Sequence, residues 1–136
     1  MKEVCAGVTE GQFRLAELKK YLLSRNLPLA VFACEDSARV KSEVKYDLKS
    51  KCLSGLVLPN DENGCPFPNH FKATSAESIQ NHFQSAPKSN YAYTTMVAPL
   101  SVAAPSFGLC VFGSDNKFQA EDVIRRWKWM TPPFME

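Results

Sequence analysis

Cysteine and histidine side chains, the usual protein ligands of zinc, occur in the middle of the chain at Cys52, Cys65, His70 and His82. A zinc finger brings its first two ligands close together in sequence, so that a single turn aims both at the metal. Here the interval from Cys52 to Cys65 is long where it should be short. We therefore expect no zinc site, and we interpret these side chains as ordinary core and loop residues.

Two adjacent acids, Glu35 and Asp36, directly follow the apolar run from Leu29 to Cys34. A continuous apolar run of this length is typical of a strand that is covered on both faces. An acidic pair behind such a strand is most often the solvated start of a turn. Because adjacent side chains on a strand point to opposite faces, only one of the two carboxylates can face a given site.

Basic and aromatic side chains alternate near the end of the chain. Arg125, Arg126 and Lys128 stand beside Trp127 and Trp129. Such a grouping can contact nucleic-acid phosphates and stack on bases, which makes DNA a candidate partner and the three basic residues its candidate binding groups. The alternative is an amphipathic helix that buries its tryptophans against a sheet and leaves its arginines in water.

The composition is that of a compact protein rather than a disordered or collagen-like one. The chain has 136 residues, 45% of them hydrophobic, and carries 16 basic against 14 acidic side chains for a net charge of +2. We predict a single domain, residues 1–136, without a membrane partner, because no apolar run approaches the roughly 20 residues that cross a bilayer. The odd number of widely spread cysteines is typical of an intracellular, reducing environment.

The elements that must position these groups follow from hydrophobic periodicity. The capping-box spacing from Thr9 to Gln12 predicts the start of an amphipathic helix that Asn26-Leu27-Pro28 ends. Strands are predicted over residues 29–34, 40–46 and 52–58, the last two antiparallel around a polar turn.

The second half of the chain is predicted in the same way. After a surface loop over residues 60–72, a second capping box at Thr74 to Glu77 starts a short helix through Phe83. Residues 90–99 and 107–112 predict further strands, with Tyr91 and Tyr93 on one face of the first. A final helix over residues 118–130 is expected to end at Thr131-Pro132-Pro133. The order of elements indicates an α/β fold whose sheet begins with an antiparallel meander and is flanked by helices.

Short segments between Glu10 and Trp129 carry a family resemblance. In chain order they are Glu10–Lys19, Asn26–Pro28, Glu35–Val40, Tyr46–Asp47, Leu53–Pro59, Asp61–Gly64, Gly113–Phe118 and Arg126–Trp127. They resemble, in the same order, a family of uncharacterised animal proteins that are similar to the catalytic region of P-element-like DDE transposases. The resemblance implies an incomplete ribonuclease H-like mixed sheet, and a nuclear location for the protein.

The resemblance also implies a chemistry for the acidic pair. In such transposases two Mg²⁺ ions flank one DNA phosphate, and carboxylates converge to hold them. The first carboxylate projects from the opening strand, which corresponds to Asp36 as catalytic residue and metal ligand, with Glu35 as the less favoured choice. One departure from the family pattern is Ala38, where the related proteins tend to carry threonine.

The other two acids of the family pattern lie beyond the final helix, so we expect the Mg²⁺ site of this chain to be incomplete. Asp115 and Asp122 are the acids nearest to replacing them, but their positions are those of a helix cap and of a first helical turn. The expected function is therefore that of a transposase-derived ribonuclease H-like fragment without independent DNA cleavage or strand transfer. The alternative is a DNA- or protein-binding module derived from a mobile element.

An incomplete sheet would leave an apolar edge that invites another chain. The apolar residues Leu109, Val111 and Phe112 lie next to the expected break in the sheet. We predict that they form such an edge, or a face that a partner covers, which makes a homo-oligomer or a partner chain the expected occupant.

Overall fold

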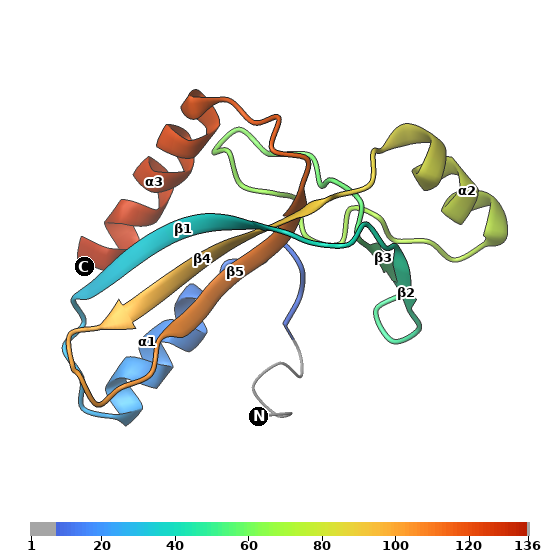
Figure 1. The fold of residues 1–136 in the computed structure, drawn as a ribbon. Coiled ribbons are helices and arrows are strands. Elements are labelled where there is room, and N and C mark those ends of the chain that lie inside the picture. The colour runs from blue at the N-terminus through green and yellow to red at the C-terminus, as the bar shows by residue number, and fades with distance from the viewer. Residues whose placement is uncertain (1–7, 136) are drawn as a thin grey trace.

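A computed structural model describes residues 8–135 of the chain. Its centre is a three-stranded sheet with the order β1 (Val31–Arg39), β4 (Tyr91–Pro99) and β5 (Phe107–Ser114) (Figure 1). Both pairings are antiparallel, with Glu35 opposite Thr95 and Tyr93 opposite Phe112. The α/β class is confirmed. The expected mixed sheet is not seen within residues 8–135, because β4 and β5 form a hairpin and β1 runs opposite to β4.

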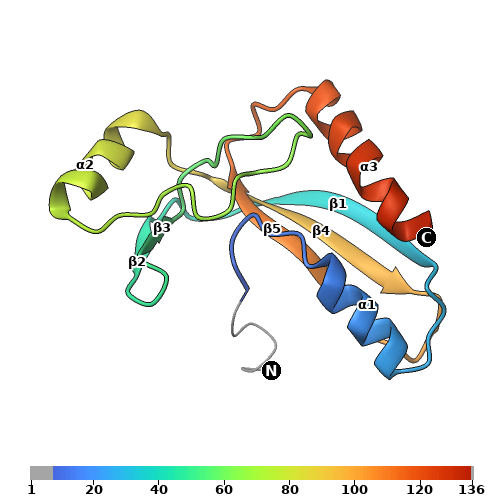
Figure 2. The ribbon, with the colours of Figure 1, turned by 180° about the vertical axis from the view of Figure 1, so that it is seen from behind.

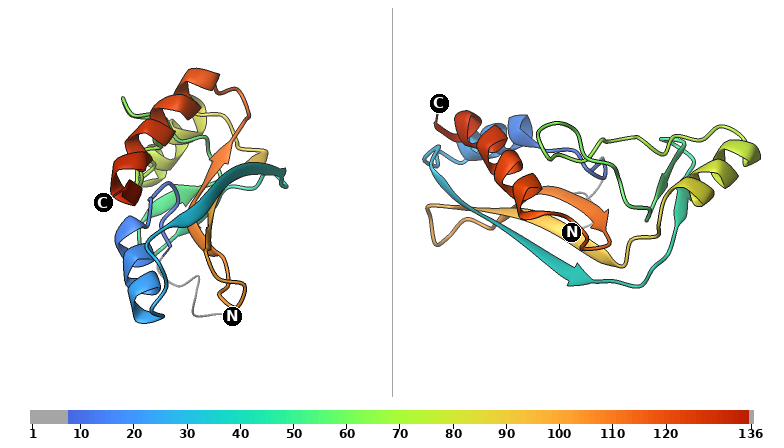
Figure 3. Two further views of the ribbon diagram at one scale, coloured as in Figure 1. Left: turned by 90° about the vertical axis from the view of Figure 1, so that its left-hand side faces the viewer. Right: turned by 90° about the horizontal axis from the view of Figure 1, so that it is seen from above.

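Two helices cover one face of this sheet. α1 (Leu15–Ser24) and α3 (Ala120–Met135) lie on the same side of the strands (Figure 3). Their buried residues join those of the strands in one core cluster: Leu18, Leu22, Val97, Leu109 and Met130. These side chains are at most 3% exposed, so the covered face is closely packed between the helices and the sheet.

Among residues 8–135, no helix covers the opposite face of the sheet. Burial alternates along β1, and the side chains of Phe32, Cys34 and Asp36 are exposed, Phe32 by 72%. The prediction of a strand covered on both faces, ending at the acidic pair, is therefore wrong. β1 continues to Arg39 because its residues stay paired with β4 as far as Tyr91.

A bulge in the β4–β5 pairing changes which side chains of β5 point to the covered face. The register shifts between Thr95 and Met96, where β5 contributes one extra residue. As a result the neighbours Leu109 and Cys110 are both buried, which a regular strand would not allow. The bulge turns an extra apolar side chain toward α1 and α3.

The chain between β1 and β4 forms a separate projection. It contains a two-stranded sheet, β2 (Lys45–Asp47) with β3 (Cys52–Ser54), and the helix α2 (Ala76–Ser85), which extend beyond one end of the main sheet (Figure 2). A second core cluster anchors this insertion to the sheet: Leu53, Leu56, Leu58, Phe71, Tyr93, Cys110 and Phe112. β2 and β3 pair antiparallel around a turn, as predicted for residues 40–46 and 52–58, although both strands are shorter than predicted. The predicted meander that places this pair beside the strand at residues 29–34 is wrong, since the neighbour of β1 is β4.

Several predicted boundaries change for local reasons. α1 begins at Leu15 without a side-chain cap, because residues 11–14 instead bond to the outer edge of β5. The capping box of α2 exists one residue later than predicted, between Ser75 and Ser78. α3 continues past the expected stop at Thr131, whose hydroxyl donates to the carbonyl of Trp127.

The two edges of the main sheet differ. At β5, the amides of Gly11 and Arg14 donate to the carbonyls of Val111 and Leu109 over 2.9 and 3.0 Å. The predicted open edge at this strand is therefore wrong, and Leu109 and Phe112 are 0% and 8% exposed. Only Val111, 38% exposed, belongs to the uncovered face. β1 is the other edge strand of the sheet, and no backbone hydrogen bond from another segment of residues 8–135 reaches its outer edge.

Candidate functional site

The acidic pair of β1 is divided between the two faces of the sheet. Glu35 points to the covered face, where its Oε1 lies 2.8 Å from Nε of Arg126 and its Oε2 lies 3.4 Å from Nη2. The hydroxyl of Tyr93 donates to the same Oε2 over 2.6 Å. The side chains of Arg126 and Glu35 are only 3% and 5% exposed, so this is a buried, hydrogen-bonded ion pair.

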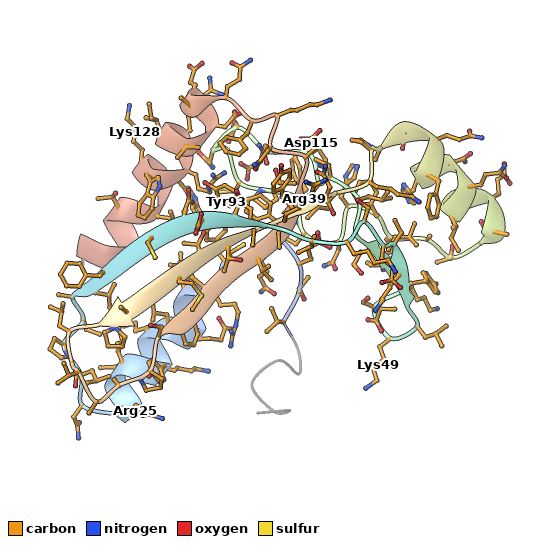
Figure 4. All side chains as sticks on the ribbon, viewed as in Figure 1. Arg25, Arg39, Lys49, Tyr93, Asp115 and Lys128 are labelled. Carbon is orange, nitrogen blue, oxygen red and sulfur yellow. The ribbon has the colours of Figure 1, made fainter. Side chains whose placement is uncertain are left out.

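Arg126 also ties a distant loop to the sheet. Its Nη1 donates to the carbonyl of Gly64 over 2.6 Å, and its guanidinium lies 5.1 Å from the ring centre of Tyr93. Tyr93 lies on the side of the sheet that faces α3 (Figure 4). One side chain thus joins α3, β1, β4 and the loop that precedes Cys65.

This network shifts the protonation of its members. Burial and the hydrogen bond to Glu35 raise the pKa of Tyr93 to about 12. Burial alone would lower the pKa of Arg126, but the hydrogen bond and charge of Glu35 outweigh it and raise that pKa. Burial likewise raises the pKa of Cys65 and of Cys110 to about 12, so both thiols stay protonated at neutral pH.

A spectroscopic titration will isolate the Tyr93 hydroxyl. Subtracting the ultraviolet titration of Tyr93→Phe from that of the unchanged protein should leave one tyrosinate with a pKa of about 12, against about 10 for a free tyrosine. Since the unfolded chain loses this proton first, the folded state should lose stability as the pH rises from about 10 to about 12. A difference titration centred near 10 would contradict the network.

The side chain of Asp36 lies on the uncovered face of the sheet. It lies opposite Thr94 in the sheet, and its Oδ1 accepts a hydrogen bond of 2.8 Å from the amide of Ser37. No group of three or more His, Cys, Asp or Glu side chains that could hold a metal ion occurs in residues 8–135. The carboxylate favoured by the sequence is exposed, and the less favoured Glu35 is unavailable to a metal because Arg126 occupies it.

The three basic residues predicted to bind nucleic acid differ in their exposure on α3. Arg126 is 2% exposed and cannot reach a phosphate, so its assignment to DNA binding is corrected by its ion pair with Glu35. Arg125 is exposed and pairs with Glu121 over 3.0 Å. Lys128 projects from the outer side of the helix (Figure 4). The DNA-binding prediction therefore depends on Arg125 and Lys128.

The remaining candidate acids have local partners. Asp115 accepts a hydrogen bond from the amide of Lys117 over 3.0 Å, and Asp122 accepts one from the amide of Gln119 over 3.2 Å. Asp122 lies in the first turn of α3 as predicted. Both carboxylates satisfy backbone donors ahead of the helix, in agreement with the cap interpretation.

The cysteines and histidines of the zinc set do not assemble a site within residues 8–135. The thiol of Cys52 lies 3.6 Å from Oδ1 of Asn69, whereas Cys65 is buried in the core. His70 and His82 both contact the ring of Phe71 edge-on, and Nε2 of His82 lies 2.9 Å from the carbonyl of Lys72. These contacts are structural: they join residues 69–72 to Cys52 of β3 on one side and to His82 of α2 on the other.

Comparison with known proteins gives no match to a family model, to a curated protein or to a solved structure. Among the described residues, no helix has the length and apolar character that a membrane span requires.

Proposed function

We propose that the chain is a transposase-derived domain of the ribonuclease H-like type, which retains the first acidic position at Asp36 and has no DNA cleavage or strand-transfer activity of its own. The observation that carries this proposal is the separation of Asp36 from Glu35. The ion pair with Arg126 holds Glu35 on the covered face. Asp36 therefore projects from the opening strand on the uncovered face, where its carboxylate is exposed to solvent and accepts the amide of Ser37 at Oδ1, as the family resemblance requires of a first metal ligand.

The order of the strands supports the same proposal. β1 pairs with β4, β4 pairs with β5, and α3 then returns along the covered face toward the start of β1 (Figure 1). A strand that followed such a helix in a ribonuclease H-like domain would find the outer edge of β1 open, because residues 11–14 cover the edge of β5. That position lies beside Asp36, where a second metal-binding carboxylate would be needed.

The chemistry of a lone carboxylate explains why no cleavage is proposed. Two Mg²⁺ ions that flank a phosphate need several converging oxygen ligands. Asp36 is exposed, and no cluster of metal-binding side chains surrounds it within residues 8–135. These residues do not fit a two-ion site.

A plasmid assay tests this proposal. Supercoiled DNA incubated with the purified chain and either Mg²⁺ or Mn²⁺ should be nicked no faster than DNA in buffer, and Asp36→Asn should behave identically. The matched acid for this comparison is Glu77→Gln, on the exposed surface of α2. Metal-dependent nicking that disappears in Asp36→Asn and persists in Glu77→Gln would overturn the claim of inactivity.

A further inference from the structure

Ser42 lies in the segment that joins β1 to the β2–β3 hairpin. Residues 40–44 belong to no helix or strand, and the side chains of Arg39, Lys41 and Ser42 are exposed. Within residues 8–135, no hydrogen bond involves the Ser42 hydroxyl or the backbone of residues 41–43. An enzyme that needs an extended and accessible substrate segment can therefore reach this hydroxyl without unfolding a helix or a strand.

Basic side chains flank Ser42 along the chain. Arg39 precedes it by three positions and Lys41 by one, Lys45 follows it, and Glu43 is the one acid among residues 39–45. Arg39 lies where β1 ends and the projecting insertion begins (Figure 4). None of these basic residues takes part in either ion pair of residues 8–135. Their charges are thus available to acidic side chains of another protein.

Three other serine and threonine residues also follow a basic residue by three positions, but each lies within regular structure. They are Ser54, Ser75 and Thr131. Ser54 belongs to β3, and the side chain of Ser75 caps the first turn of α2. Thr131 lies within α3, where its hydroxyl donates to a backbone carbonyl. Ser42 therefore differs from the other three in lying outside helices and strands with an unengaged hydroxyl.

We propose that Ser42 is a phosphorylation site for a serine kinase that recognises basic side chains ahead of the hydroxyl, with Arg39 as the main recognition residue. Kinases select substrates by such charge patterns, and acidic subsites pair well with a guanidinium. In the transfer, Oγ of Ser42 bonds to the γ-phosphorus of ATP, the bond from that phosphorus to the oxygen of the departing ADP breaks, and the hydroxyl proton passes to a base of the kinase. The proposal does not depend on the transposase-derived function.

Phosphorylation would offset the positive charge of this part of the surface. Residues 39–45 carry three basic side chains and one acidic side chain. A phosphoserine adds a charge of about −1.5 to −2 at neutral pH. Lys41 and Lys45 line a hollow of about 270 Å³ that residues 89–92 and 111–113 also border. The modification therefore places negative charge on the segment that forms one wall of this hollow.

Incubating the full chain with activated calmodulin-dependent protein kinase II, ATP and Mg²⁺ tests the proposal. Intact-mass and tandem mass spectrometry should show one phosphate per chain, located on Ser42, and Ser42→Ala should stay unmodified. Ser50→Ala, which removes an exposed hydroxyl of the neighbouring hairpin, should be modified like the unchanged protein. Phosphate on Ser54 or Ser75 in place of Ser42, or a chain that the kinase leaves unmodified, would overturn the proposal.

Two arginine variants test how the kinase recognises the segment. Arg39→Ala should lower the initial rate of phosphate transfer to Ser42 at least about tenfold, because it removes the cation that the acidic subsite binds. Arg25→Ala changes another exposed arginine, at the end of α1, and should leave the rate unchanged. Equal rates for Arg39→Ala and Arg25→Ala would refute the role of Arg39.

Discussion

Replacing Arg126 by alanine will destabilise the protein by about 3–5 kcal/mol, because it leaves the buried carboxylate of Glu35 without its counter-ion. The substitution also removes the donor to the carbonyl of Gly64, so the loop before Cys65 loses its link to α3. Urea unfolding, followed by far-ultraviolet circular dichroism, measures this loss. Few single changes in a domain of this size exceed that range.

The neighbouring arginine provides the matched control. Arg125 also forms an ion pair, with Glu121, but its side chain is 49% exposed and that of Glu121 is 68% exposed. Because exposed pairs contribute about 0–1 kcal/mol, Arg125→Ala should leave the free energy of unfolding nearly unchanged. Equal losses of unfolding free energy in Arg126→Ala and Arg125→Ala would show that the buried ion pair stabilises the protein no more than the exposed one.

A double substitution separates the charge from the packing. Glu35→Leu combined with Arg126→Met removes both charges and keeps most of the volume. Replacing a buried ion pair by apolar side chains is often neutral or stabilising, so the double variant should recover much of the stability that Arg126→Ala loses. If it remains as unstable as Arg126→Ala, the hydrogen bonds to Tyr93 and Gly64 dominate instead.

Alanine at position 64 will also be strongly destabilising, by about 2–4 kcal/mol from a strained backbone and a steric clash. Gly64 has a φ of +72°, and a Cβ atom there would lie 2.2 Å from the carbonyl oxygen of Asp122. Relieving this clash moves the loop away from α3, which also displaces the carbonyl that Arg126 contacts. Thermal and urea unfolding measure the change.

Gly108→Ala is the control for this prediction. Gly108 lies in β5, and an added Cβ would have Met96 Sδ as its neighbour at 3.9 Å, an ordinary contact. The free energy of unfolding should therefore change by no more than about 0.5 kcal/mol. A Gly64→Ala variant as stable as Gly108→Ala would mean that the loop is not held against α3.

Local sequence patterns were sufficient to predict those strands and turns whose formation depends on residues close in sequence. β4 and β5 lie close to the strands predicted at residues 90–99 and 107–112, the second from its apolar run, and the turn before Cys52 follows from its polar residues. Tyr91 and Tyr93 occupy alternate positions of β4 and share a face as predicted. Periodicity depends on residues that are close in sequence, so a strand predicted from it does not depend on how distant segments pack.

The sequence-based predictions failed where the position of a residue depends on a partner far away in the chain. The capping box at Thr9 is spaced correctly, yet residues 11–14 instead bond to β5. Arg126 was expected to face water, yet it is buried against Glu35, which lies 91 positions earlier in the chain. No local signal distinguishes Arg126 from the exposed Arg125, because the difference lies in which side of α3 meets the sheet.

The sequence by itself determined the α/β class, the alternation that sets Glu35 and Asp36 on opposite faces, and the chemical character of each candidate residue. Only the tertiary structure decided which of the two acids turns inward, which arginine pairs with it, and which sheet edge remains open. Those choices depend on the free energy of pairing groups far apart in the chain: a buried carboxylate is stable only where a distant guanidinium and hydroxyl reach it.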